Sequence, residues 1–248
     1  MEVHAHSHTQ RKKWYHYFWE FFMLFLAITL GFLVENLREH SVERHREKEY
    51  IYSLLKDLEY DTLQFSRTIS TLKTKIPYFD SVLLFLDNPP AYNNRLSFDF
   101  YIKTHLENFY DPAEPTIQQL KSSGNLRLLE NKLVLDSILI YDSHINGPYR
   151  NQTNYVIEFN KRLIQYTEKM FDPRNFNHFL NDVFNESDNN NPDYSLILYS
   201  KDKAQVQELY SLYVNVKATN VFYINHLQAR RKEAERLLVF IKKEYHLE

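Results

Sequence analysis

The chain contains no cysteine and only three glycines among its 248 residues. Without cysteine, thiol catalysis, disulfide bonds and zinc sites with cysteine ligands are all excluded. Gly31 lies in a long apolar run, which leaves only Gly124 and Gly147 for the rest of the chain. Loops that hold phosphates or dinucleotides use several glycines close together, so the sequence offers no such loop.

Strong charge and catalytic motifs are also missing. The net charge of −2 gives no electrostatic reason to expect nucleic-acid binding. The sequence has no HExxH motif, and Ser122-Ser123-Gly124 lacks the strand–turn–helix setting of a nucleophile elbow. A helix end with Gly124 in the left-handed conformation is the better interpretation of that tripeptide. We therefore expect no enzyme activity, no cofactor and no identifiable small-molecule substrate.

The most prominent feature is the apolar run 14–34, WYHYFWEFFMLFLAITLGFLV, in which Glu20 is the only acidic residue. A helix of ~20 mostly apolar residues is long enough to cross a membrane. A cleaved signal peptide is disfavoured, because Glu35-Asn36-Leu37-Arg38 follows the run in place of a small-residue cleavage site. The apolar character on all sides of residues 21–34 disfavours a buried core helix. The sequence thus predicts one retained transmembrane helix over residues 14–34.

One face of this predicted helix differs from the rest. At 100° per residue, Glu20, Leu24, Ala27 and Gly31 lie within roughly 40° of one line. Ala27 and Gly31 form a small-xxx-small pair, which lets helix backbones approach closely. Our hypothesis is that this face contacts another helix and buries Glu20 there, because a carboxylate in hydrocarbon is costly. In the alternative, Glu20 lies at headgroup depth within an aromatic belt of Trp14, Tyr15, Tyr17 and Trp19.

A polar tail, residues 1–13, precedes the apolar run and carries His4, His6 and His8. Imidazoles at this spacing can bind zinc, nickel or copper weakly, although a solvated tail without a metal role is the simpler interpretation. The tail also carries the basic cluster 11–13, and positive residues tend to stay on the cytoplasmic side of a membrane. We expect the N-terminus inside the cytoplasm and the body outside it.

Helical periodicity continues beyond the apolar run. Apolar residues at steps of three and four extend from Ile51 to Ile76, and neither proline nor glycine interrupts residues 35–76. These residues are predicted to form a charged helical stalk, in which Glu35 and Arg38 can pair at i,i+3. After Pro77, residues 82–86 form either a kinked continuation or a second short helix.

The remainder, residues 77–248, is predicted to be a helical bundle domain that packs with the stalk. Helical patterns cover 97–110, 116–121, 126–170 with a break near 146–148, and 203–245, whereas 194–199 is undecided and 185–193 reads as a surface loop. The last helix has a heptad stripe of Val206, Tyr213, Asn220, Leu227, Ala234 and Ile241. The predicted fold is all-α: a single N-terminal transmembrane helix continuing into a stalk, then an antiparallel bundle of long helices whose first and last members pack together.

Two segments carry a resemblance to a known family. They are WEFFMLFLAITLGFLVENLREH, which follows the histidine-rich tail, and PTIQQLKSSGNLRLLENKLVLDSILIYD further along. The chain resembles a family of uncharacterised Bacteroidota proteins with one N-terminal membrane helix, grouped as a domain of unknown function. The resemblance implies a membrane-anchored helical protein of the bacterial inner membrane and brings no catalytic residues.

The sequence as a whole predicts a membrane-anchored structural or regulatory interaction protein. Its expected partners are the lipid bilayer and either a second copy of the chain or another membrane protein, with no nucleic acid. Two alternatives stay open: a transport or ion-coupling subunit that uses Glu20 as a working carboxylate, and a single-pass sensor.

Overall fold

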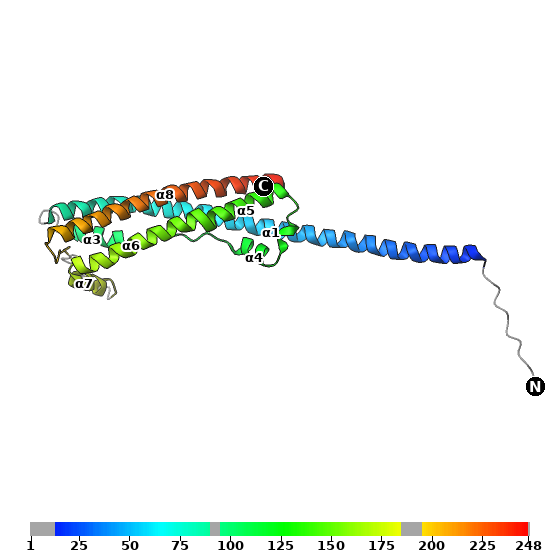
Figure 1. Ribbon diagram of the computed structural model, residues 1–248, viewed down its shortest axis with the longest axis horizontal. Coiled ribbons are helices and arrows are strands. Elements are labelled where there is room, and N and C mark those ends of the chain that lie inside the picture. The colour runs from blue at the N-terminus through cyan, green and yellow to red at the C-terminus, as the bar shows by residue number, and fades with distance from the viewer. Residues whose placement is uncertain (1–12, 90–94, 185–194, 248) are drawn as a thin grey trace, which may run out of the picture. The chain divides into compact units, whose positions relative to one another are not determined.

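The computed structural model describes residues 13–89, 95–184 and 195–247. The chain divides into two compact units, Met1–Ile51 and Tyr52–Glu248, and helix α1 (Trp14–Asp87) contributes to both (Figure 1). Apart from turns and connecting segments, the described residues are helical, with one isolated β-bridge between Phe171 and Leu198. The all-α prediction is confirmed.

In the first unit, α1 holds the apolar run and the charged residues that follow it. The predicted pair forms, with Arg38 Nη2 2.5 Å from Glu35 Oε1 and Arg38 Nε 3.0 Å from Glu35 Oε2. Both side chains are well exposed, so solvent and salt screen the attraction and it adds little stability. This part of α1 owes its charge pairing to local i,i+3 spacing.

The second unit contains residues 52–87 of α1 and all the later elements. These are α3 (Arg95–His105), α4 (Pro115–Ser122), the 3₁₀ turn η1 (Asn125–Leu128), α5 (Lys132–His144), the π-helical turn η2 (Ile145–Tyr149), α6 (Arg150–Met170), α7 (Pro173–Phe184) and α8 (Lys203–Glu244). Residues 52–76, assigned to the stalk from the sequence, therefore belong to the compact unit. Pro77 lies inside α1, so residues 82–86 continue the same helix.

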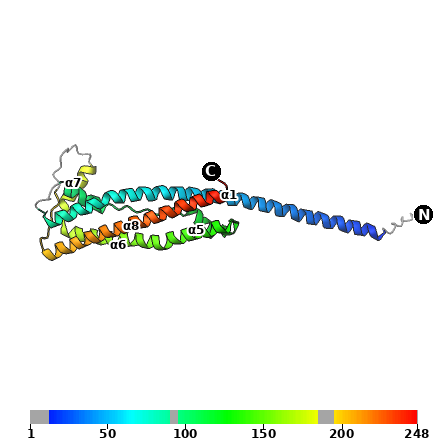
Figure 2. The ribbon, with the colours of Figure 1, turned by 90° about the horizontal axis from the view of Figure 1, so that it is seen from above.

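Helix α8 runs antiparallel to the second half of α1 (Figure 2). Lys242 pairs with Glu59 at 3.4 Å, Arg231 Nη1 lies 3.4 Å from Ser66 Oγ, and Lys217 pairs with Asp80. From one pair to the next, the residue number in α8 falls as the residue number in α1 rises, which shows that the two helices are antiparallel. The expected packing of the first helix against the last is confirmed.

Helices α5 and α6 run in the same direction as α1. The Tyr141 hydroxyl of α5 reaches Asp61, and the Tyr149 ring at the start of α6 contacts Phe65 at 5.8 Å between centroids. Helices α5 and α6 are in turn antiparallel to α8, with His144 of α5 beside Glu233 and Tyr166 of α6 beside Glu208. The chain returns between α1 and α5 through α3, an irregular segment at 106–114 and α4. We call residues 106–114 the strap.

Local capping explains several helix boundaries. Asn131 Oδ1 accepts hydrogen bonds from Leu133 N and Val134 N, so α5 begins at Lys132 and not near residue 126 as its periodicity suggested. Gly124 has φ +70°, which confirms its predicted left-handed conformation. Asp202 Oδ1 accepts from Gln205 N and caps α8, whose predicted extent is confirmed within a residue.

Two other boundaries differ from the predictions. Helix α3 ends at His105 and not at residue 110, because the strap bonds to side chains of α1 and leaves the helical path. Helix α7 was not predicted. The undecided run 194–199 is not helical over its described residues 195–199, and Tyr199 N donates to Met170 O at 2.8 Å beside the isolated bridge. The predicted loop 185–193 lies outside the described residues.

Candidate functional site

The apolar run of α1 is exposed on every side. One helix is long and apolar enough to span a membrane, and none of the side chains in its most apolar stretch is buried. Glu20, Leu24, Ala27 and Gly31 all lie in this helix at spacings of four, three and four, which places them on one face. A Cβ added at Gly31 would meet nothing within 4 Å, so the face is open there. The tail candidates His4, His6 and His8 lie outside the described residues.

The core-facing stripe of α1 contains two charged residues. Its predicted apolar members from Ile51 to Leu72 are buried, whereas Ile76 is half-buried. Asp61 and Lys75 occupy equivalent positions with 1% and 4% exposure. Burying a charge without partners costs several kcal/mol, so both groups require compensation. The strap provides hydrogen-bonding partners for both.

Asp61 accepts three hydrogen bonds. The Tyr110 hydroxyl donates to Oδ1 at 2.5 Å, Ala113 N donates to the same oxygen at 2.7 Å, and the Tyr141 hydroxyl donates to Oδ2 at 2.9 Å. Burial raises the pKa of Asp61, while the three donors oppose that shift. The carboxylate joins the strap to α1 and α5.

Two tyrosines continue the network toward α8. Tyr149 donates to Tyr110 O at 2.5 Å, so its single hydroxyl hydrogen is used, and Tyr223 must be the donor in the 2.9 Å contact between the two hydroxyls. Burial, reinforced by the neighbouring carboxylate or hydroxyl, raises the pKa values of Tyr110, Tyr141 and Tyr149. These hydroxyls stay protonated at neutral pH and act as fixed donors, not as nucleophiles.

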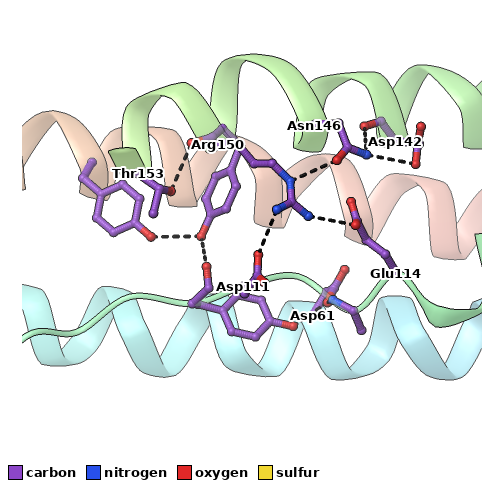
Figure 3. Close-up of polar contacts among 11 residues, drawn as sticks. Asp61, Asp111, Glu114, Asp142, Asn146, Arg150 and Thr153 are labelled. Atoms are coloured by element: carbon purple, nitrogen blue, oxygen red, sulfur yellow. Dashed lines mark hydrogen bonds and ion pairs between the residues drawn. The ribbon is translucent and has the colours of Figure 1, made fainter. Parts of the chain in front are cut away.

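Arg150 connects the end of the strap to α6. Its Nη2 lies 2.8 Å from Glu114 Oε2, and its Nε donates to Asn146 Oδ1 at 2.9 Å. Asn146 belongs to the π-helical turn and donates to Asp142, which also pairs with Lys121 of α4 (Figure 3). The sequence break predicted near 146–148 is thus a wide helical turn that turns Asn146 toward Arg150.

Lys75 holds the beginning of the strap. Its ammonium donates to Leu106 O at 2.6 Å and lies 5.6 Å from the centroid of the Phe79 ring. Burial lowers the pKa of Lys75 to about 8, against an opposing attraction from Glu107. At neutral pH the lysine is still mostly charged, so the carbonyl and the ring face receive a cation.

The chemistry of this network is that of structural support. The three donors around Asp61 are satisfied by its carboxylate, whereas Glu114 Oε1 is buried without a hydrogen-bond partner. No tyrosine hydroxyl of the network has the lowered pKa of an activated nucleophile. Among residues 13–89, 95–184 and 195–247, no three histidine or acidic side chains gather as a metal ion would require. The arrangement positions the strap and the adjoining end of α3.

The end of α3 carries a half-buried histidine. The Tyr101 carbonyl can only accept, so His105 Nδ1 is the donor in their 2.7 Å contact, and Nε2 is left to accept from Thr167 Oγ1 at 3.0 Å. Burial lowers the pKa of His105 to about 4, and the nearby Lys75 charge acts in the same direction. The imidazole is therefore neutral near pH 7.

We expect the free energy of unfolding to fall as the pH decreases from about 6.5 to about 4. The unfolded chain binds a proton at His105 near pH 6.5 and the folded chain only near pH 4, so acid favours unfolding by about 2 kcal/mol, discounted for the partial exposure of the ring. Urea titrations of the full chain in mild detergent at pH 7 and 4.5 measure the loss. His105→Gln should lose less than the unsubstituted chain over the same interval, and equal losses would contradict the assignment.

The sequence did not reveal Asp61, Lys75 or the strap as a linked set. The only available signal was an acid and a lysine at core-facing positions of the helical stripe in α1. No protein-family model, curated protein or solved structure matches this chain. Its function is therefore argued from its own residues.

Proposed function

We propose that the chain is a single-pass membrane-anchored interaction protein, a structural or regulatory subunit that associates with a second copy of itself. The observation that carries the proposal is the helical run 14–34, which is apolar on all sides over residues 21–34 and has no buried side chain in its most apolar stretch. Leaving so much apolar surface in water is costly, and a bilayer removes that cost.

The buried side chains of the second unit favour a structural or binding role for the protein. Its buried hydroxyls and carboxylates hold one segment of the chain in place, as the Asp61 contacts show. We place the anchor in a bacterial inner membrane, with the N-terminal tail in the cytoplasm and the second unit in the periplasm. This orientation follows from the basic cluster at residues 11–13.

The face that contains Ala27 and Gly31 is the proposed contact between copies. Small side chains at this spacing let two helices approach within van der Waals distance of each other's backbone. Such a contact also brings the two Glu20 residues near each other, where one can be protonated or both can bond across the interface.

Single cysteines can test this contact, since the chain has none of its own. In membranes washed with alkaline carbonate, we expect Ala27→Cys and Gly31→Cys to form disulfide-linked dimers about fivefold faster than Thr29→Cys, because a disulfide needs Cα atoms within ~7 Å. Thr29 lies on the opposite face, and gel mobility without reductant measures the dimer.

Three results would contradict parts of the proposal. Loss of the chain from carbonate-washed membranes would exclude the anchor. Equal crosslinking at all three positions would exclude the shared face. An adduct of Gly31→Cys with a different protein would exclude self-association.

A further inference from the structure

The second unit contains a cavity that the buried network does not use. It has a volume of about 600 Å³ and lies between α3, α6, α7 and the non-helical residues 195–197. Protein interiors are close-packed and leave few spaces larger than a water molecule. Small-molecule sites commonly enclose about 300–1,000 Å³. The volume is thus that of a ligand site and not of a packing defect.

Most of the cavity wall is apolar. Twelve of its seventeen lining residues are aliphatic, aromatic or proline, and five of these carry aromatic rings, among them Phe98, Tyr101 and Phe179. Phe176 and Leu106 line the same space and remain 42% and 56% exposed. A ligand that covered these side chains would remove apolar surface from water, which is favourable in proportion to the area covered.

The polar part of the wall is mainly uncharged. His105 and Thr167 lie together on one side, with the imidazole neutral at pH 7 and Nε2 3.0 Å from the threonine hydroxyl. The threonine hydroxyl has one hydrogen, and when it donates that hydrogen to Ile164 O at 2.8 Å, the His105 Nε2 lone pair is left to accept from a ligand. These groups suit a hydroxyl, carbonyl or amide, each of which forms hydrogen bonds without bringing a charge.

The charged residues of the wall disfavour an anion. Among the described residues that line the cavity, Glu168 and Asp172 are the only acidic ones, and none is a lysine or an arginine. Arg174 outside the wall pairs with Asp172 and lowers the pKa of that carboxyl to about 2, so Asp172 stays ionised. A carboxylate or phosphate ligand would meet two negative charges without a cation inside the cavity.

We propose that this cavity binds one uncharged lipid-like molecule, with its hydrocarbon body between α3, α6 and α7 and its hydroxyl, carbonyl or amide group at His105 and Thr167. The apolar wall provides affinity, and the His105–Thr167 pair orients the polar group. Binding of this kind does not depend on the contact between membrane helices proposed above, because every lining residue belongs to the second unit.

The site can be tested by photolabelling the full chain in nanodiscs. The probe is a long-chain alcohol that carries a diazirine on its hydrocarbon chain, and its sites of attachment are mapped by peptide mass spectrometry. We expect labelling of α3, α6 and α7 that saturates and is competed by unlabelled dodecanol. Residues 14–34 serve as an internal reference, because a lipid-like probe labels any membrane-embedded segment without saturation.

Two variants reduce the volume of the cavity. Ile164→Trp and Leu106→Trp place an indole in it, and we expect cavity labelling to fall about tenfold in each, the equivalent of a tenfold loss in affinity. Ile140→Trp makes a matched change at a position of α5 that is 54% exposed and outside the cavity, and it should leave labelling unchanged. Circular dichroism melting confirms that each variant is folded.

The charge of the ligand is tested with the corresponding diazirine fatty acid. We expect the carboxylate probe to label the cavity about tenfold less than the alcohol at pH 7.5, because it brings an unpaired negative charge to Glu168 and Asp172. Equal labelling by both probes would overturn the assignment of an uncharged ligand. Labelling confined to residues 14–34, or cavity labelling that persists in both folded tryptophan variants, would overturn the site itself.

Discussion

Asp61→Ala is expected to lower the free energy of unfolding of the second unit by about 4 kcal/mol. The substitution removes the acceptor of three hydrogen bonds and leaves the Tyr110 hydroxyl, the Tyr141 hydroxyl and Ala113 N without it. Each buried donor without a partner costs about 1–3 kcal/mol. A 30 Å³ space already adjoins Asp61, and a water molecule that enters it can bond some of these donors. The total loss in the free energy of unfolding is therefore smaller than the sum of the three costs.

Urea titration of the full chain in mild detergent measures this loss, and hydrogen exchange of residues 106–114 shows whether the strap is released. Asp61→Asn retains one acceptor oxygen and should cost less than the alanine variant. The matched control is Asp136→Ala, at an exposed position of α5, which should change stability by less than about 0.5 kcal/mol. A cost below about 1 kcal/mol for Asp61→Ala would show that the strap is held by other contacts.

This arrangement explains why charged residues are found on a core-facing stripe. Asp61 and Lys75 lie at opposite ends of the strap, one accepting from Tyr110 and Ala113 and the other donating to Leu106 O. An apolar residue at either position would fit the buried stripe of α1 but would leave strap groups without partners. The two charges thus select one path for a segment that has no helical hydrogen bonds of its own.

The strap also links the network to the cavity. Leu106 follows His105 directly, and both line the cavity, while Lys75 fixes the carbonyl of Leu106. Support at this point therefore positions one wall of the cavity. Asp61 and Lys75 do not line the cavity. They affect it indirectly, because they fix the backbone of the strap that forms part of its wall.

The long helices were predictable because their signals are local. Five of the six heptad residues named for α8 are buried, and Gly124 adopts the left-handed conformation that the sequence suggested at a helix end. Periodicity of three and four also identified the buried face of α1 from Ile51 to Leu72. In each case the responsible interactions lie within a few residues of one another or repeat along one helix.

The strap and the cavity were not predictable, because they depend on contacts between distant residues. Tyr110 lies 49 residues from Asp61, and His105 lies 62 residues from Thr167. Periodicity predicted that α3 continues to residue 110, because the spacing of aromatic residues is helical up to that point. The pattern does not show that Asp61 bonds Tyr110 and Ala113 and so ends the helix earlier. No local pattern could reveal a volume enclosed by four separate segments.

Leu227→Ala is expected to lower the free energy of unfolding by about 3 kcal/mol, because the stabilisation from burying the leucine side chain is lost and a cavity remains in its place. Leu227 is fully buried in the stripe of α8 that faces the bundle. Leu63→Ala makes the same change on α1 at a position 48% exposed, and it should cost less than about 0.5 kcal/mol because alanine is a good helix former. Urea titration of the three chains under one condition gives both differences.

Ala234 lies one heptad after Leu227 and is also fully buried. Because a larger side chain there would force its neighbours apart, Ala234→Leu should destabilise the fold although it adds apolar surface. Loss of stability from both a smaller residue at 227 and a larger one at 234 would show that α8 packs in one fixed register. If Leu227→Ala cost no more than Leu63→Ala, the heptad stripe would not be the contact that holds α8 in the bundle.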